Sequence, residues 1–193
     1  STVNGNVNLR GMFVTKLDGA GQTVWSNRFS SEPGDYVSTI GLSPNGDLIV
    51  TGAASLNLGG VELGQQDAFV AKIDKTTGAV LWVTAAGSPE SDFPTGMAFD
   101  RDGNIYVTGE TLGTLPGTTA NQGGVDVFVV KVGPSGGVLS NWQRGGAGDD
   151  LAAGIAVDAC GGVYVGGFTT GTLVAGQPNA GGRDMFLLKA ALR

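Results

Sequence analysis

The sequence contains no histidine and only one cysteine, Cys160. Without histidine, Ser-His-Asp triads, imidazole metal ligands and imidazole acid-base catalysis are all excluded. One cysteine excludes an intrachain disulfide and any cysteine-cluster metal site. Most common enzyme designs are therefore excluded before any motif is considered.

Charge and long apolar runs are also scarce. Charged residues make up 15% of the chain and the formal net charge is -6. Nucleic acids and anionic membranes bind clustered Lys and Arg, so neither is an expected partner. No apolar run approaches the roughly 18 residues of a membrane helix, and the start of the chain does not resemble a signal peptide. We therefore expect no membrane insertion.

Glycine, in contrast, is abundant, with 35 residues among 193. So much glycine can indicate disorder, but hydrophobic residues make up 41% of the chain and favour a packed fold. Glycine is then expected at turns between strands.

An internal repeat of about 58 residues runs through the whole chain. GLSPNGDLIVTG at 41–52 recurs at 98–109 and at 156–167, and FVTKLD at 13–18 recurs at 69–74, 128–133 and 186–191. Each unit divides into four short strands separated by Gly, Asn and Asp turns. The first strand is predicted at Ile40–Leu42, Met97–Phe99 and Ile155–Val157, and the fourth strand carries Trp25, Trp82 or Trp142.

Four antiparallel strands per unit, repeated in series, predict an all-β chain of β-propeller blades. A β-solenoid is the alternative, although its period is usually shorter. The repeat units are predicted at about 1–36, 37–93, 94–151 and 152–193 within one domain spanning 1–193, the first and last units being incomplete.

The stretch PTGMAFDRDGNIYVTGET resembles the first two strands of NHL-type blades. The whole unit, with GDD before the first strand and DxFVxK at the third, resembles the bacterial beta-propeller repeats called SBBP repeats. The resemblance implies that the first strand is innermost and the Trp-bearing strand outermost. It also implies a secreted or surface-exposed bacterial protein, in a family whose members share no single activity.

The strands amount to three four-stranded blades plus one surplus strand, whereas complete propellers have about 4 to 8 blades. We expect a partial propeller, or half of a six-bladed ring formed by two chains. An open stack exposes two apolar blade faces, which normally form interfaces. Self-association, or packing against further blades of a longer chain, is the expected partnership.

The loops between second and third strands, at 53–66, 110–125 and 168–183, are long, and long loops are often functional. The face that they form is therefore a predicted binding surface for a glycan or protein ligand. Its candidate residues are the acids before each first strand and three loop amides: Asp35, Asp92, Asp150, Asn121, Gln122 and Asn179. The favoured alternative is that the acids accept hydrogen bonds from backbone amides of their own loops.

Two further patterns have both a functional and a structural interpretation. Asp100 and Asp102 have the spacing of calcium ligands, but Asp-Gly is also a common hairpin turn, which we favour. The tryptophans are able to stack on sugars, but their recurrence within strands favours packing between blades. No metal and no cofactor is expected.

The sequence thus predicts a non-enzymatic structural or interaction module of a secreted or surface bacterial protein. A glycan-binding, lectin-like propeller is the first alternative. A propeller enzyme is the second, and it is disfavoured because paired catalytic carboxylates are needed and glutamate is scarce.

Overall fold

Every regular element in the described part of the chain is a β-strand. The structure, a computed structural model, describes residues 12–28, 34–55, 57–58, 61–62 and 66–192. Within these residues no helix is long and apolar enough to cross a membrane. The strands alternate with tight turns at the glycine-rich segments, so the prediction of an all-β chain is confirmed.

In the described residues, four antiparallel sheets follow one another along the chain, and a fifth, two-stranded sheet of β5 (Asn57–Leu58) and β6 (Val61–Glu62) lies within one loop. The N-terminal hairpin comprises β1 (Phe13–Leu17) and β2 (Thr23–Arg28). The second sheet comprises β3 (Tyr36–Leu42), β4 (Leu48–Ala54), β7 (Asp67–Ile73) and β8 (Val80–Ala85). The third sheet comprises β9 (Asp92–Phe99), β10 (Ile105–Thr111), β11 (Asp126–Val132) and β12 (Val138–Arg144). The last sheet comprises β13 (Asp150–Val157), β14 (Val163–Thr169) and β15 (Asp184–Ala190).

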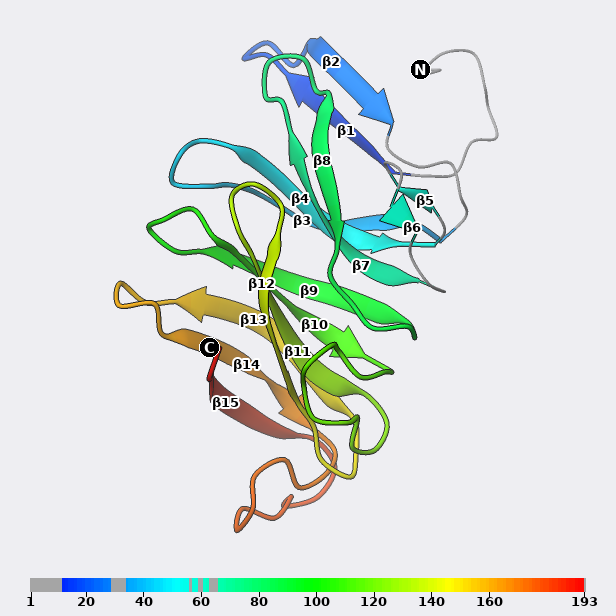
Figure 1. The fold of residues 1–193 in the computed structure, drawn as a ribbon, viewed down its shortest axis with the longest axis vertical. Coiled ribbons are helices and arrows are strands. Elements are labelled where there is room, and N and C mark those ends of the chain that lie inside the picture. Colours follow the sequence, from blue (N-terminus) through cyan, green and yellow to red (C-terminus); the bar gives the residue numbers. More distant parts are fainter. Residues whose placement is uncertain (1–11, 29–33, 56, 59–60, 63–65, 193) are drawn as a thin grey trace.

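Within each sheet the strands pair in chain order, as in the blades of a propeller. Figure 1 shows the sheets stacked along the long axis, from the blue hairpin to the red β15. Contacts between neighbouring sheets are concentrated on the first strands, β3, β9 and β13. This agrees with the expectation that the first strand of each blade is innermost. The chain is a partial β-propeller.

The first strands are longer than the sequence predicted. β9 begins at Asp92, five residues before the predicted Met97, and β13 begins at Asp150 rather than at Ile155. Pro94 and Gly96 in this stretch favour a turn locally, but ladder pairing with β10 extends the strand through them. The short hairpin of β5 (Asn57–Leu58) and β6 (Val61–Glu62), within the loop between β4 and β7, was not predicted.

The core consists of apolar layers between neighbouring sheets. One face of β11 contributes Phe128, Val130 and Val132 to the layer against the second sheet. The other face contributes Val127 and Val129 to the layer against the last sheet. A central blade is therefore apolar on both faces, because a sheet covers each of them.

One glycine recurs at the same place in each of the three larger sheets. Gly52, Gly109 and Gly167 lie in the second strands, beside the register shift in the pairing with the first strand. A Cβ at each position would collide with a carbonyl oxygen of the first strand, at Tyr36, Phe93 and Leu151 respectively. Only glycine allows the two backbones to approach this closely.

Candidate functional site

Two of the predicted ligand-binding acids are sealed inside the long-loop face. Asp92 and Asp150 are both 0% exposed. The Asp92 Oδ2 accepts a hydrogen bond from the Ser88 amide at 2.6 Å, and the Asp150 Oδ2 accepts one from the Gly146 amide at 2.6 Å. The favoured interpretation, an acid that holds its own loop, is confirmed for both residues. Neither carboxylate is accessible to a ligand in this structure.

Asp35 holds a loop in a different way. Its Oδ1 accepts hydrogen bonds from the backbone amide and the hydroxyl of Ser55, at 2.8 and 3.1 Å. Ser55 belongs to the long loop at 53–66, of which residues 56, 59–60 and 63–65 lie outside the described part of the chain. Asp35 therefore fastens the start of that loop to the first strand.

The candidate asparagines also fasten loops, at equivalent positions in two blades. The Asn121 amide group donates to the Thr111 and Gly124 carbonyls, at 3.4 and 3.3 Å. Asn179 donates in the same way to the Thr169 and Gly182 carbonyls, at 3.3 and 3.4 Å. Both amide groups therefore close their loops.

Gln122 is exposed, and its backbone amide donates to Asp126. Ligand binding by the long-loop face stays a prediction.

Carboxylates of neighbouring sheets interact at two junctions. One junction joins the second and third sheets, and the other joins the third and last sheets. Asp67 on β7 acts on Asp92, and Asp150 on β13 acts on Asp126, in each case as a like charge that raises the neighbour's pKa. Burial is the larger cause, and it raises the pKa of Asp92 from 3.8 to about 7 and that of Asp126 above its ordinary value. Between about pH 4 and pH 7, Asp92 therefore stays protonated, whereas an exposed aspartate is ionised.

One residue that the sequence did not single out organises the loop between β10 and β11. Gln143 on β12 is 5% exposed. Its Oε1 accepts from the Leu115 amide at 2.9 Å and from the Thr118 hydroxyl at 3.1 Å. Its Nε2 donates to the Gly113 carbonyl and to Asp126, both at 2.9 Å. Gln143 pairs with the third-strand Phe128, and the residues that pair with the equivalent phenylalanines of the first two sheets are Arg28 and Ala85. Because the residue type changes from repeat to repeat, the repeat did not indicate a role for Gln143.

Replacing Gln143 with methionine is expected to loosen this loop. Four hydrogen bonds are lost, and the buried Leu115 amide is left without its acceptor, which costs about 2–3 kcal/mol of unfolding free energy. Hydrogen exchange at Leu115 should accelerate at least tenfold. As a control, Asn141→Ala removes a single exposed bond to the Pro116 carbonyl and should leave that rate unchanged. Equal exchange rates in wild type and Gln143→Met would contradict this role.

The predicted turn role of Asp100 is confirmed. Its Oδ1 accepts hydrogen bonds from the Asp102 and Asn104 amides, at 3.0 and 2.9 Å, so the carboxylate holds the hairpin turn. Among the residues that the structure describes, no group of three or more Cys, Asp or Glu residues is placed to hold a metal ion.

Trp25 and Trp82 pack between blades, as the favoured interpretation held. Trp25 lies against the turn that joins β7 and β8, and Trp82 against the turn that joins β11 and β12. Trp142 was predicted to be their repeat equivalent, and this was wrong. Trp25 and Trp82 pair with Lys16 and Lys72, whereas Ser140 takes that position opposite Lys131 and Trp142 lies two residues further, opposite Val129.

The two ends of the stack expose apolar side chains whose repeat equivalents are buried. At the C-terminal end, Met185 and Leu187 of β15 are 93% and 75% exposed, while Val127 and Val129 at the same positions of β11 are 0% exposed. At the N-terminal end, Phe13 is 62% exposed, whereas Phe128 is fully buried. Leu17, Ile40 and Leu42 on the same N-terminal face are also more than half exposed.

Residues 81–116 match the family described as Beta-propeller repeat, SBBP. Residues 81–116 therefore carry an SBBP beta-propeller repeat. The matched stretch runs from β8 through β9 and β10 into the following loop, and so covers the fourth strand of one blade and the first two of the next. The SBBP family is typically non-catalytic. No curated protein matches the chain.

Proposed function

We propose that this SBBP chain is a non-enzymatic interaction module that associates through its two open blade faces. The C-terminal face carries Met185 and Leu187, and the N-terminal face carries Phe13, Leu17, Ile40 and Leu42. A propeller fold by itself assigns no activity, so the proposal rests on these faces rather than on the fold.

The observation that carries the proposal is the contrast between equivalent positions. Leu187 and Val129 hold the same position in the third strand of their blades. Val129 packs against the next sheet and is fully buried, whereas Leu187 points to the side where no described sheet follows and is 75% exposed. Large contiguous apolar surfaces on a folded chain usually mark interaction sites. The exposed face of β15 is therefore a blade face without a neighbour in the described chain.

The experiment replaces Met185 and Leu187 together with serine. The free energy that drives association should fall by about 2–4 kcal/mol, because the two side chains bury most of their apolar surface in a blade contact. We expect at least a tenfold weaker association constant by sedimentation velocity. The matched control is Leu81→Ser with Leu139→Ser, which removes two leucines 54% and 56% exposed on the outer strands β8 and β12. That control should associate like wild type.

Two outcomes would contradict the proposal. The first is a wild-type chain that stays monomeric at every concentration and binds no partner through β15. The second is an equal loss of association in the control variant. A secreted or surface location forms part of the proposal and is supported by the resemblance to SBBP repeats alone. Glycan binding at the long-loop face is not preferred, because the Asn121 and Asn179 amides already bond their own loops.

A further inference from the structure

The outer strand of the third sheet, β12, has an unpaired edge. In the described residues β12 pairs with β11 alone and ends its sheet on that side. Such an edge presents N–H and C=O groups that another strand can bind, and proteins often protect it with lysine, proline or a bulge. The segment 140–144 contains neither lysine nor proline, and its pairing with β11 is regular, since the register shift lies next to it, between Lys131 and Val132. This edge is therefore open to pairing.

The equivalent outer strand of the second sheet, β8, has a neighbouring strand from its own long loop, because β6 contacts it. The corresponding loop of the third sheet, at 112–125, contains no strand. It lies over one face of β12, where the Asn141 side chain donates to the Pro116 carbonyl at 3.0 Å and the Gln143 side chain accepts from the Leu115 amide at 2.9 Å. The loop covers a face of β12 and leaves the strand edge open.

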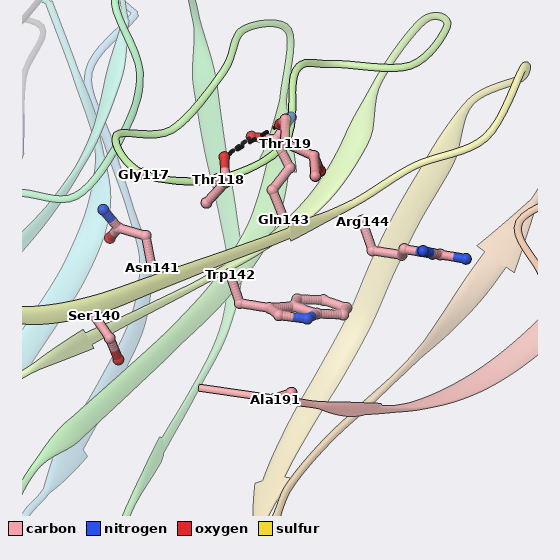
Figure 2. A pocket seen from close by; sticks show the side chains of 9 residues that line it. All are labelled: Gly117, Thr118, Thr119, Ser140, Asn141, Trp142, Gln143, Arg144 and Ala191. Carbon is pink, nitrogen blue, oxygen red and sulfur yellow. Dashed lines mark hydrogen bonds between the residues drawn. The ribbon is translucent and has the colours of Figure 1, made fainter. Parts of the chain in front are cut away.

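A groove of about 440 Å³ follows this edge. Five consecutive residues of β12, at 140–144, line it together with loop residues 117–119 and with Ala191, which directly follows β15. Figure 2 shows Trp142 and Ala191 on one side of β12 and Thr119 on the other. Successive side chains of a strand point to opposite faces, so a groove that five consecutive residues line runs along the strand edge and not over one face.

The walls of the groove indicate which side chains fit it. Ser140, Trp142 and Arg144 alternate along β12 and therefore share one face. The Ser140 hydroxyl is buried and has no hydrogen-bond partner among the described residues, whereas buried polar groups usually have one. One Arg144 N–H donates to the Leu173 carbonyl at 3.0 Å. Since no carboxylate lines the groove as the structure describes it, the groove is positive in a chain of net charge -6.

We propose that the edge of β12 binds an extended, acidic peptide segment of another protein as an added strand. In this mode main-chain hydrogen bonds supply affinity, and the pockets for alternate side chains supply specificity. The segment 140–144 accommodates about five residues, or roughly 17 Å of extended chain. An aliphatic side chain of the peptide packs on the Trp142 indole, and a carboxylate two residues away pairs with Arg144. The site goes beyond the proposed function, because the residues of the open blade faces do not line it.

The probe is the synthetic peptide Glu-Thr-Val-Thr-Val, acetylated and amidated at its ends. Antiparallel pairing with β12 places its glutamate beside Arg144 and its central valine beside Trp142. We expect saturable binding to the full-length chain by isothermal titration calorimetry.

Two derivatives of the probe test pairing with the strand edge directly. One is N-methylated at the glutamate and both valines, and the other at both threonines. Only alternate residues of a strand direct their N–H groups toward the same neighbour. One derivative should therefore bind at least tenfold more weakly than the parent, because its main-chain hydrogen bonds are lost, and the other should bind like the parent.

The variant Arg144→Gln tests the charge pairing. It should bind the parent peptide about two- to fivefold more weakly than wild type does. It should bind a peptide with glutamine in place of the glutamate as wild type does. Arg101→Gln is the matched control, because it neutralises an exposed arginine outside the groove, and it should bind the parent peptide like wild type.

Each result decides one part of the proposal. Absence of saturable binding, or equal affinities of the two methylated derivatives, overturns pairing with the β12 edge. An equal loss in Arg144→Gln and Arg101→Gln overturns the acidic specificity, because the effect then follows the net charge of the chain. Association through the open blade faces is measured separately by sedimentation velocity and stands or falls independently.

Discussion

Replacing Asp92 with asparagine is expected to remove much of the loss of stability that the chain undergoes between about pH 4 and pH 7. Asp92 is 0% exposed, and burial raises its pKa from 3.8 to about 7. In this window the folded chain keeps the Asp92 proton while the unfolded chain releases it. The free energy of unfolding therefore falls as the pH rises through the window and levels off above about pH 7.

The expected size follows from the displacement of the pKa. About three pH units correspond to roughly 4 kcal/mol, which makes this one of the largest single contributions expected in the chain. Asparagine retains an oxygen for the Ser88 amide and carries no charge, so its contribution does not vary with pH. It also removes the repulsion between Asp92 and Asp67.

Urea unfolding at a series of pH values from 4 to 8 measures the effect. Wild type should lose stability across the series, and Asp92→Asn should show a much flatter profile and higher stability than wild type at pH 8. Asp102→Asn, which changes an exposed carboxylate, is the control and should follow wild type. If Asp92→Asn and wild type have parallel profiles, the carboxyl is not the protonated group.

Replacing Gly109 with alanine is expected to destabilise the third sheet by about 3–5 kcal/mol. The new Cβ would run into the Phe93 carbonyl oxygen and would also lie 2.7 Å from the Pro94 Cα and 2.9 Å from the Phe128 ring. Relief requires β9 to move away from β10, and β9 packs against the neighbouring sheets on both sides. The strain therefore cannot be released by a side-chain rotation.

Gly154→Ala provides the matched control for Gly109→Ala. Gly154 also lies within a strand, β13, but a Cβ there meets nothing within 4 Å. Its replacement should change stability by less than about 1 kcal/mol, with a slight gain from the lost flexibility of the unfolded chain. Chemical denaturation of the two variants measures the contrast. Equal effects would show that the collision at Phe93 does not govern the cost.

The strands that recur with apolar alternation could be predicted from the sequence alone. The FVTKLD and GLSPNGDLIVTG segments fall in strands and turns of the structure, because their periodicity and turn residues agree with the pairing. The first strands were predicted too short, since Pro94 and Gly96 favour a turn and only pairing with β10 keeps them extended.

The candidate binding surfaces were harder to predict from the sequence. The exposed end faces could be predicted from the number and order of the strands. Whether an acid is accessible to a ligand or buried in its loop depends on tertiary packing, which the neighbouring residues in the sequence do not determine. Asp92 and Asp150 illustrate this, as both are acids before a strand and both are buried. The position of Trp142 was missed because alignment by residue type matched the tryptophans, whereas the strand register matches Ser140 to Trp82.

The pairing of an indole with the next blade's glycine turn also bears on how such a chain can change its length. Duplicating one unit adds one tryptophan side and one turn side, and the new junction can satisfy both. The number of open blade faces stays constant at two, whatever the number of units. Gene duplication can therefore lengthen the stack without creating a new kind of exposed surface.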